Sequence, residues 1–100
     1  MYYVYILYSV KFDKYYIGST EDPDKRLSEH NTSPHNTYTS KYRPWTLAAV
    51  FPLSETRDIA VRYERKLKSL KSRNIILDLV NHNWDVEYFA QLVRVPTRRD

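Results

Sequence analysis

Apolar and aromatic positions at the start of the chain predict two β-strands joined by a short turn. Residues 2–8 read Tyr-Tyr-Val-Tyr-Ile-Leu-Tyr, and this density of aromatic and β-branched side chains is typical of strands. Residues 9–14 are mostly polar and suit a turn, after which residues 15–18, Tyr-Tyr-Ile-Gly, resume the strand pattern. Because the connection is short, we expect the two strands to pair as an antiparallel hairpin.

The middle of the chain predicts a helix, a polar loop and a third strand. Asp22 is a favourable N-cap residue, and Pro23 suits the first helical position, where its missing N–H costs nothing. We expect this helix to end near His30. Residues 35–43 are polar and loop-like, and the apolar run over residues 45–53 predicts the third strand.

Apolar residues spaced by three and four positions predict further helices in the second half of the chain. One stripe consists of Ala60, Tyr63, Leu67 and Leu70, and a second apolar face consists of Ile75, Ile76, Leu79 and Val80. Ser54 or Thr56 suits the start of the first of these helices, and Ser72 suits a break or a restart. The apolar residues within 84–92 fit either a last helix or a packed extended segment.

The predicted element order is therefore β-β-α-β-α-α, an α+β fold with a small three-stranded antiparallel sheet flanked by helices. We expect residues 1–93 to form one domain and residues 94–100 to form a basic, flexible tail. The sequence has no cysteine, which excludes disulfides and thiolate metal sites. It also has no bilayer-spanning apolar run and no signal-peptide pattern, so we expect a cytoplasmic protein without membrane contact. The sequence does not give the oligomeric state, and a monomer is assumed.

Two short motifs on the predicted hairpin carry the main functional signal. Tyr3-Val4-Tyr5 lies on the first strand, and Tyr16-Ile17-Gly18 lies on the second. They are followed in order by Ser19-Thr20, Lys25 to Asn31, Lys41-Tyr42-Arg43-Pro44-Trp45, Ser54 to Glu64, and Lys68 to Arg73. Together these segments resemble the GIY-YIG nuclease family, and most of all its short bacterial members that consist of this domain alone. The first motif departs from the family pattern, with Tyr3 and Val4 in place of glycine and isoleucine.

The resemblance implies a divalent-metal-dependent endonuclease that hydrolyses phosphodiester bonds of DNA, which we favour over RNA. It implies weakly specific or structure-selective cleavage in DNA repair or recombination. Matched residue by residue, it assigns catalysis to Tyr5, Tyr16, Arg26, His30 and Glu64, and supporting roles to Gly18 and Asn81. Glu64 would also hold the one cation, Mg²⁺ or Mn²⁺.

Phosphodiester hydrolysis needs an activated water and charge relief on the phosphoryl oxygens. In the family the two tyrosines position the attacking water. If the hairpin register places Tyr5 opposite Tyr16, both hydroxyls emerge on one face of the sheet. Val4, Ile6 and Ile17 then point into the core on the other face. The alternative for each tyrosine is ordinary sheet packing, for which tyrosine is a common choice.

The remaining candidates also have both a functional and a structural interpretation. Arg26 and His30 are four residues apart, so they share a helix face and suit phosphate binding and proton transfer, or else form a solvated surface pair. One carboxylate, Glu64, suffices for a cation that keeps most of its waters, or else it pairs with Lys68. Gly18, the only glycine, indicates a positive φ or a close backbone approach.

The net charge of +4 favours an anionic partner, nucleic acid first, although extra lysines also serve solubility. The candidates for backbone contacts are Lys41, Arg43, Lys68, Lys71 and Arg73. Each of them also fits a solvated charged face. Two other functions remain open: a nucleic-acid-binding module of the same fold with little or no cleavage of its own, and an interaction domain whose tyrosines serve packing.

Overall fold

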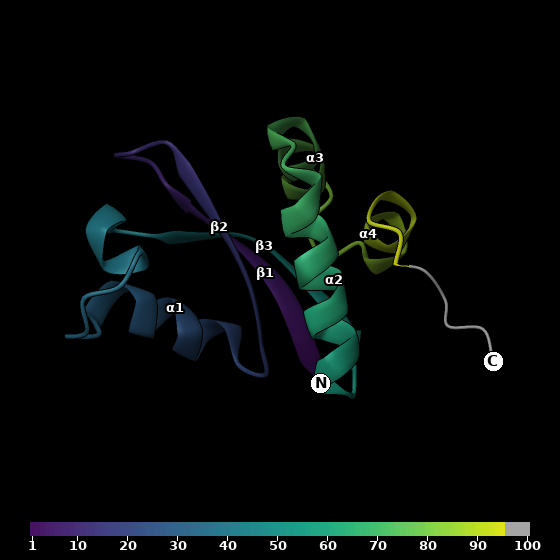
Figure 1. Ribbon diagram of the computed structural model, residues 1–100, viewed down its shortest axis with the longest axis horizontal. Helices are drawn as coiled ribbons and strands as arrows, with labels where there is room; N and C mark the ends of the chain where they lie inside the picture. The colour runs from purple at the N-terminus through teal and green to yellow at the C-terminus, as the bar shows by residue number, and fades with distance from the viewer. Residues whose placement is uncertain (96–100) are drawn as a thin grey trace.

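In the computed structural model, which describes residues 1–95, a three-stranded antiparallel sheet lies between α1 on one face and α2, α3 and α4 on the other (Figure 1). The strands are β1 (Tyr2–Ser9), β2 (Lys14–Thr20) and β3 (Thr46–Ser54), and β1 is central. The helices are α1 (Pro23–Thr32), α2 (Arg57–Leu70), α3 (Arg73–Val80), α4 (Val86–Leu92) and the short 3₁₀ helix η1 (Thr39–Tyr42). The predicted α+β fold is confirmed, with α4 and η1 added to the predicted order.

Alternation along β1 divides the core into two layers. Val4 and Ile6 are fully buried and pack with residues of α2, α3 and α4, including Leu67, Leu79 and Phe89. The alternate positions, Tyr5 and Leu7, are also buried and pack on the α1 side with Trp45 and Leu27. Burying an apolar side chain of this size stabilises a fold by about 1.5–3 kcal/mol, so both layers hold the central strand in place.

The hairpin of β1 and β2 is fastened to the start of α3. Asp13 takes a positive φ of 52° in the turn, which aspartate tolerates better than most residues. Its carboxylate accepts hydrogen bonds from the Tyr8 hydroxyl, at 2.7 Å, and from the Arg73 guanidinium, at 2.5 Å. Because these contacts join residues far apart in sequence, the hairpin tip is held against the second half of the chain.

Two helix starts follow the predicted capping residues, whereas Thr56 stands at the N-cap position of α2 without a side-chain capping hydrogen bond. Asp22 accepts a hydrogen bond from the Lys25 amide, and Ser72 accepts one from the Ile75 amide, so Ser72 restarts the helix after α2. Asp85 caps α4 in the same way, which decides in favour of a last helix. The loop over residues 35–43 is not entirely irregular, because it contains η1.

The turn between α3 and α4 lies against the outer edge of β3. Asn83 Oδ1 accepts a hydrogen bond from the Val50 amide at 2.8 Å, and the Trp84 amide donates to the Val50 carbonyl at 3.1 Å. Residues 96–100 of the predicted tail lie outside the described residues. Among residues 1–95, no helix has the length and apolar character needed to cross a membrane.

Candidate active site

A buried chain of polar side chains connects β1, α1 and η1. The Tyr5 hydroxyl lies 2.9 Å from His30 Nε2, and His30 Nδ1 lies 3.0 Å from the Thr39 hydroxyl. Tyr5 is 1% exposed, and His30 and Thr39 are each 6% exposed. A neutral imidazole has one donor and one acceptor nitrogen, so the two contacts together fix the ring orientation, and the tautomer sets which hydroxyl donates to it. Thr39 was not among the sequence candidates, because nothing local marks a threonine in a polar loop.

The burial of this chain sets its protonation. Burial raises the pKa of Tyr5 to about 12, and the neighbouring Arg26 guanidinium opposes only part of that rise. Burial likewise lowers the pKa of His30 to about 4, with the positive charge of Arg26 as the next cause. Tyr5 and His30 are therefore both neutral around pH 7.

Gly18 makes room for the Tyr5 ring. The two residues are paired across β1 and β2, and a Cβ added at Gly18 would lie 2.5 Å from Tyr5 Cζ and closer still to the hydroxyl oxygen. Gly18 does not have a positive φ, and β2 continues past it to Thr20. Of the two predicted reasons for the glycine, the positive φ is absent, and the close approach at its backbone is made by the Tyr5 side chain.

Tyr16 lies on the same face of the hairpin as Tyr5, but the two are diagonal neighbours. Tyr5 pairs with Gly18, two residues further along β2, so the ring centroids are 6.5 Å apart. The directly opposed register considered above is wrong, because the length of the turn shifts the pairing by two positions. Tyr16 is half-buried and lines a pocket of about 700 Å³ with Arg26 and His30, whereas the Tyr5 hydroxyl is covered.

Arg26 is directed into the site from α1. Its guanidinium donates to Glu29 Oε1 at 2.8 Å, which raises the pKa of Arg26 and lowers that of Glu29. The next turn is attached to the start of β3, because the Asn31 amide donates to the Trp45 carbonyl at 2.9 Å and accepts from the Trp45 amide at 2.7 Å. This double contact fixes α1, and therefore Arg26, against the sheet.

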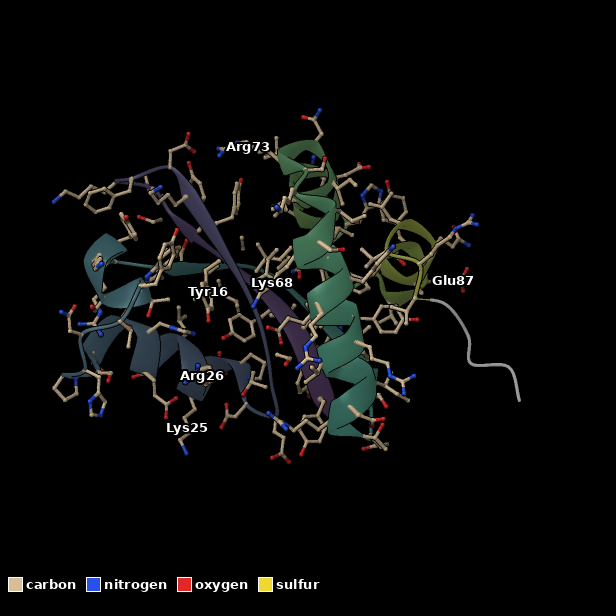
Figure 2. All side chains as sticks on the ribbon, viewed as in Figure 1. Tyr16, Lys25, Arg26, Lys68, Arg73 and Glu87 are labelled. Carbon is tan, nitrogen blue, oxygen red and sulfur yellow. The ribbon has the colours of Figure 1, made fainter. Side chains whose placement is uncertain are left out.

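Glu64 approaches the edge strand β2 from the opposite face of the sheet. Its Oε1 accepts a hydrogen bond from the Ser19 hydroxyl at 2.6 Å, and its Oε2 pairs with Lys68 Nζ at 2.7 Å. The Lys68 ammonium also lies 5.8 Å from the centroid of the Tyr16 ring. Figure 2 shows Tyr16 and Lys68 in the space between α1 and α2, with Arg26 on α1. The five catalytic candidates thus gather around β2, with the tyrosines and α1 on one face and Glu64 on the other.

The basic candidates differ in how much of their charge remains available. Lys41, Lys68 and Lys71 are exposed, and Lys71 ends α2 in a left-handed conformation. Arg73 is exposed but pairs with the carboxylate in the hairpin turn. Arg43 uses its guanidinium within the fold, because that group donates to the carbonyls of His30 and Ser33 at the end of α1. These bonds satisfy carbonyls that a helix end leaves unpaired.

Asn81, the residue expected to support the site, lies at the end of α3. Asn81 is the exposed C-terminal cap of α3, and within residues 1–95 its side chain makes no hydrogen bond. The asparagine that contacts the sheet is Asn83, two residues further on, through Val50. Because α3 ends at Val80, the turn that follows carries Asn83, and not Asn81, to β3.

The donor chemistry at Glu64 fits a hard divalent cation. No cluster of three or more His, Asp or Glu side chains suited to a metal occurs within residues 1–95, so protein ligands alone do not complete a coordination shell. Mg²⁺ and Mn²⁺ accept such a site, since they keep several waters and need only one or two carboxylates. The Glu64 side chain is 17% exposed, and its partner Lys68 is exposed. Because a surface ion pair of this kind is worth at most about 1 kcal/mol, Glu64 Oε2 can give up Lys68 for a cation at little cost.

Comparison with known families agrees with this arrangement. Residues 1–76 match the family described as the GIY-YIG catalytic domain. The chain belongs to the GIY-YIG family. The matched segment covers β1, β2, α1, β3 and α2, and so includes all five catalytic candidates.

Three proteins named structure-specific endonuclease subunit SLX1 are similar to this chain. The identity is 36% over 71 residues with the protein of Debaryomyces hansenii, 37% over 71 residues with that of Candida dubliniensis, and 35% over 80 residues with that of Paracoccidioides lutzii. These alignments cover 65%, 65% and 74% of this chain but only 20%, 25% and 18% of the relatives. A UPF0213 protein of Bacillus halodurans, solved by solution NMR, is 29% identical with a TM-score of 0.49, over 96% of this chain and 100% of its own.

Proposed function

We propose that this GIY-YIG domain is a divalent-metal-dependent endonuclease that hydrolyses phosphodiester bonds in DNA. The observation that carries the proposal is the convergence of Tyr5, Tyr16, Arg26, His30 and Glu64 on the edge strand β2. The structure-specific endonuclease names of the fungal relatives support a substrate with branched or otherwise irregular DNA, as met in repair and recombination.

In this mechanism Tyr16 is the tyrosine that orients the attacking water, because it lines the open pocket. Tyr5 acts as a positioning residue, since its covered hydroxyl holds His30 and its pKa of about 12 makes it a poor base. The neutral His30 imidazole packs against the Tyr16 ring and keeps that ring in place. The Arg26 guanidinium, always charged, binds the phosphoryl oxygens as negative charge develops.

Glu64 would hold the divalent cation, with Ser19 fixing the orientation of its carboxylate. When bound, Mg²⁺ or Mn²⁺ supplies Lewis-acid charge relief on the phosphoryl group and its leaving oxygen. With a cation held there, Lys68 would no longer be needed to pair with Glu64 and would be free to contact a substrate phosphate. The exposed Lys41, Lys71 and Arg73 add sequence-independent contacts to the nucleic-acid backbone.

The test is cleavage of plasmid, duplex and branched DNA with Mg²⁺ or Mn²⁺ by the wild type, Glu64→Ala and Arg26→Ala. Both substitutions should lower the rate by at least about 100-fold, the usual effect of removing one group that stabilises developing charge. Matched controls are Lys25→Ala, the exposed neighbour of Arg26, and Glu87→Ala, an exposed glutamate on α4 (Figure 2). Both controls should keep wild-type rates. Cleavage that survives in Glu64→Ala and Arg26→Ala with unchanged circular dichroism would overturn the proposal.

A second candidate function rests on the occupied carboxylate of Glu64. Since both its oxygens are engaged by Ser19 and Lys68, the domain also suits nucleic-acid binding without cleavage of its own. That function predicts salt-dependent binding, no metal-dependent cutting by the wild type, and no loss of affinity in Glu64→Ala.

A further inference from the structure

A row of aromatic rings extends from the hairpin tip to the proposed active site. We call Phe12, Tyr42, Tyr38 and Tyr16 the aromatic row. The ring centroids of successive members are 5.3, 4.9 and 6.3 Å apart. The members come from three separate parts of the chain, namely the hairpin turn, the segment around η1, and β2. Folding has therefore assembled a continuous aromatic surface that no local sequence pattern marks.

The aromatic row is unusually open for its composition. Phe12 is 40% exposed and Tyr38 is 49% exposed, although the chain buries other large aromatic side chains such as Phe51 and Phe89 completely. Tyr38 also separates two hollows, since it lines both the 700 Å³ pocket of the proposed active site and a second pocket of about 340 Å³. Exposed rings gathered along one path mark a binding surface more often than single exposed rings do.

Positive charges follow the aromatic row along its length. Lys14 Nζ lies 4.9 Å from the centroid of the Tyr42 ring, and Lys68 Nζ lies 5.8 Å from that of Tyr16. Lys14, Lys68 and Lys71 also line the second pocket, which opens beside Tyr38. Aromatic platforms interleaved with lysines match the chemistry of an unpaired nucleic-acid strand, whose bases stack on rings while its phosphates pair with cations.

We propose that the aromatic row binds an unpaired nucleic-acid strand and guides it to Tyr16. This inference rests on the proposed function, because it assigns to that site a substrate with a single-stranded segment beside the scissile bond. Bases of the strand pack on Tyr38 and Phe12, and phosphates lie along Lys14 and Lys68. In a continuous duplex the bases are already stacked and paired, so duplex DNA gains only the phosphate contacts.

The experiment measures binding without cleavage. Fluorescein-labelled oligodeoxythymidine, alone or annealed to its complement, is titrated with protein in EDTA, and anisotropy reports the affinity. Tyr38→Ala should weaken single-strand binding by about 5- to 100-fold, the effect of losing one stacking platform, and should change duplex binding by less than about twofold. Phe12→Ala should act in the same direction. Tyr38→Phe, which keeps the ring, should bind the single strand as the wild type does.

Trp84→Ala is the matched control, since Trp84 is 59% exposed and stacks on Tyr3 outside the aromatic row. It should leave single-strand affinity unchanged. The inference is overturned if Tyr38→Ala has no effect, if it weakens both substrates equally, or if Trp84→Ala has the same effect as Tyr38→Ala. Selective loss in Tyr38→Ala with no metal-dependent cutting by the wild type keeps the aromatic row and overturns the proposed enzyme. If metal-dependent cutting is lost in Glu64→Ala but single-strand binding is unchanged in Tyr38→Ala, the proposed enzyme is kept and the role of the aromatic row is overturned.

Discussion

Gly18→Ala is the smallest substitution that should disturb both the fold and the proposed site. The added Cβ would lie 2.5 Å from Tyr5 Cζ, whereas carbon atoms in ordinary contact are about 3.5–4.0 Å apart. The ring must therefore move by about 1 Å or the strands must separate. Neither is free, because the Tyr5 ring is 1% exposed and its hydroxyl is bonded to His30.

The expected cost follows from these contacts. Overpacking a buried site costs about 1–3 kcal/mol, and leaving the buried Tyr5–His30 contact unmade costs about 1–3 kcal/mol more. Alanine recovers only about 0.4–1 kcal/mol by restricting the unfolded chain. We expect the free energy of unfolding to fall by about 2–4 kcal/mol, which lowers the melting temperature of a domain of this size by at least about 8 °C.

The assay is urea unfolding of a double-mutant cycle in which Tyr5→Leu supplies the second change. A leucine does not reach the space above Gly18, so Gly18→Ala should cost less than about 1 kcal/mol in that background. A coupling energy of more than about 1 kcal/mol is the expected result. Equal stability of Gly18→Ala and wild type, or additive effects in the cycle, would refute the close packing of Tyr5 on Gly18.

Three further predictions concern α1 and its contacts. The pKa of His30 is about 4 in the fold and 6.5 in the unfolded chain, so between these pH values only the unfolded state gains the proton. The free energy of unfolding should therefore fall by roughly 3 kcal/mol from pH 6.5 to pH 4. In urea titrations His30→Gln should lose this part of the pH dependence. Asn31→Ala removes both hydrogen bonds to Trp45 and should lower the free energy of unfolding by about 2 kcal/mol in thermal melts, whereas an unchanged melt would contradict the attachment of α1 to β3. Arg43→Lys removes the forked contact at the end of α1, so amide hydrogen exchange at Ser33 should become faster, and an unaltered rate would show that the fork does not hold the helix end.

Local patterns were enough to predict most of the fold. The alternation of residues along β1 and β2 predicted correctly that Val4, Ile6 and Ile17 face one core and Tyr5 the other face. The capping role of Asp22 was equally predictable, since a cap depends on residues within one helical turn. These features share a short range: each is decided by neighbours in sequence or by the period of the strand.

The parts that sequence did not predict depend on distant partners. The hairpin register follows from turn geometry, so the diagonal placement of Tyr5 and Tyr16 was not evident from either strand. Arg43 donates hydrogen bonds to carbonyls at the end of α1 that are ten or more residues away in sequence. Thr39 contacts His30, which is nine residues away. A charged or polar residue in a loop carries no local mark of such a partner.

The two edges of the sheet differ in how they resist joining another sheet. On β3, Pro52 removes one backbone donor, and Asn83 and Trp84 occupy both polar groups of Val50, so a foreign strand finds little to pair with there. On β2 the proposed site needs an accessible edge, and such an edge is also a template for self-association. Lys14 and Lys68 lie beside that edge and therefore have a second consequence, because like-charged copies repel one another. Solubility should depend on these lysines most at low ionic strength, since salt screens their repulsion.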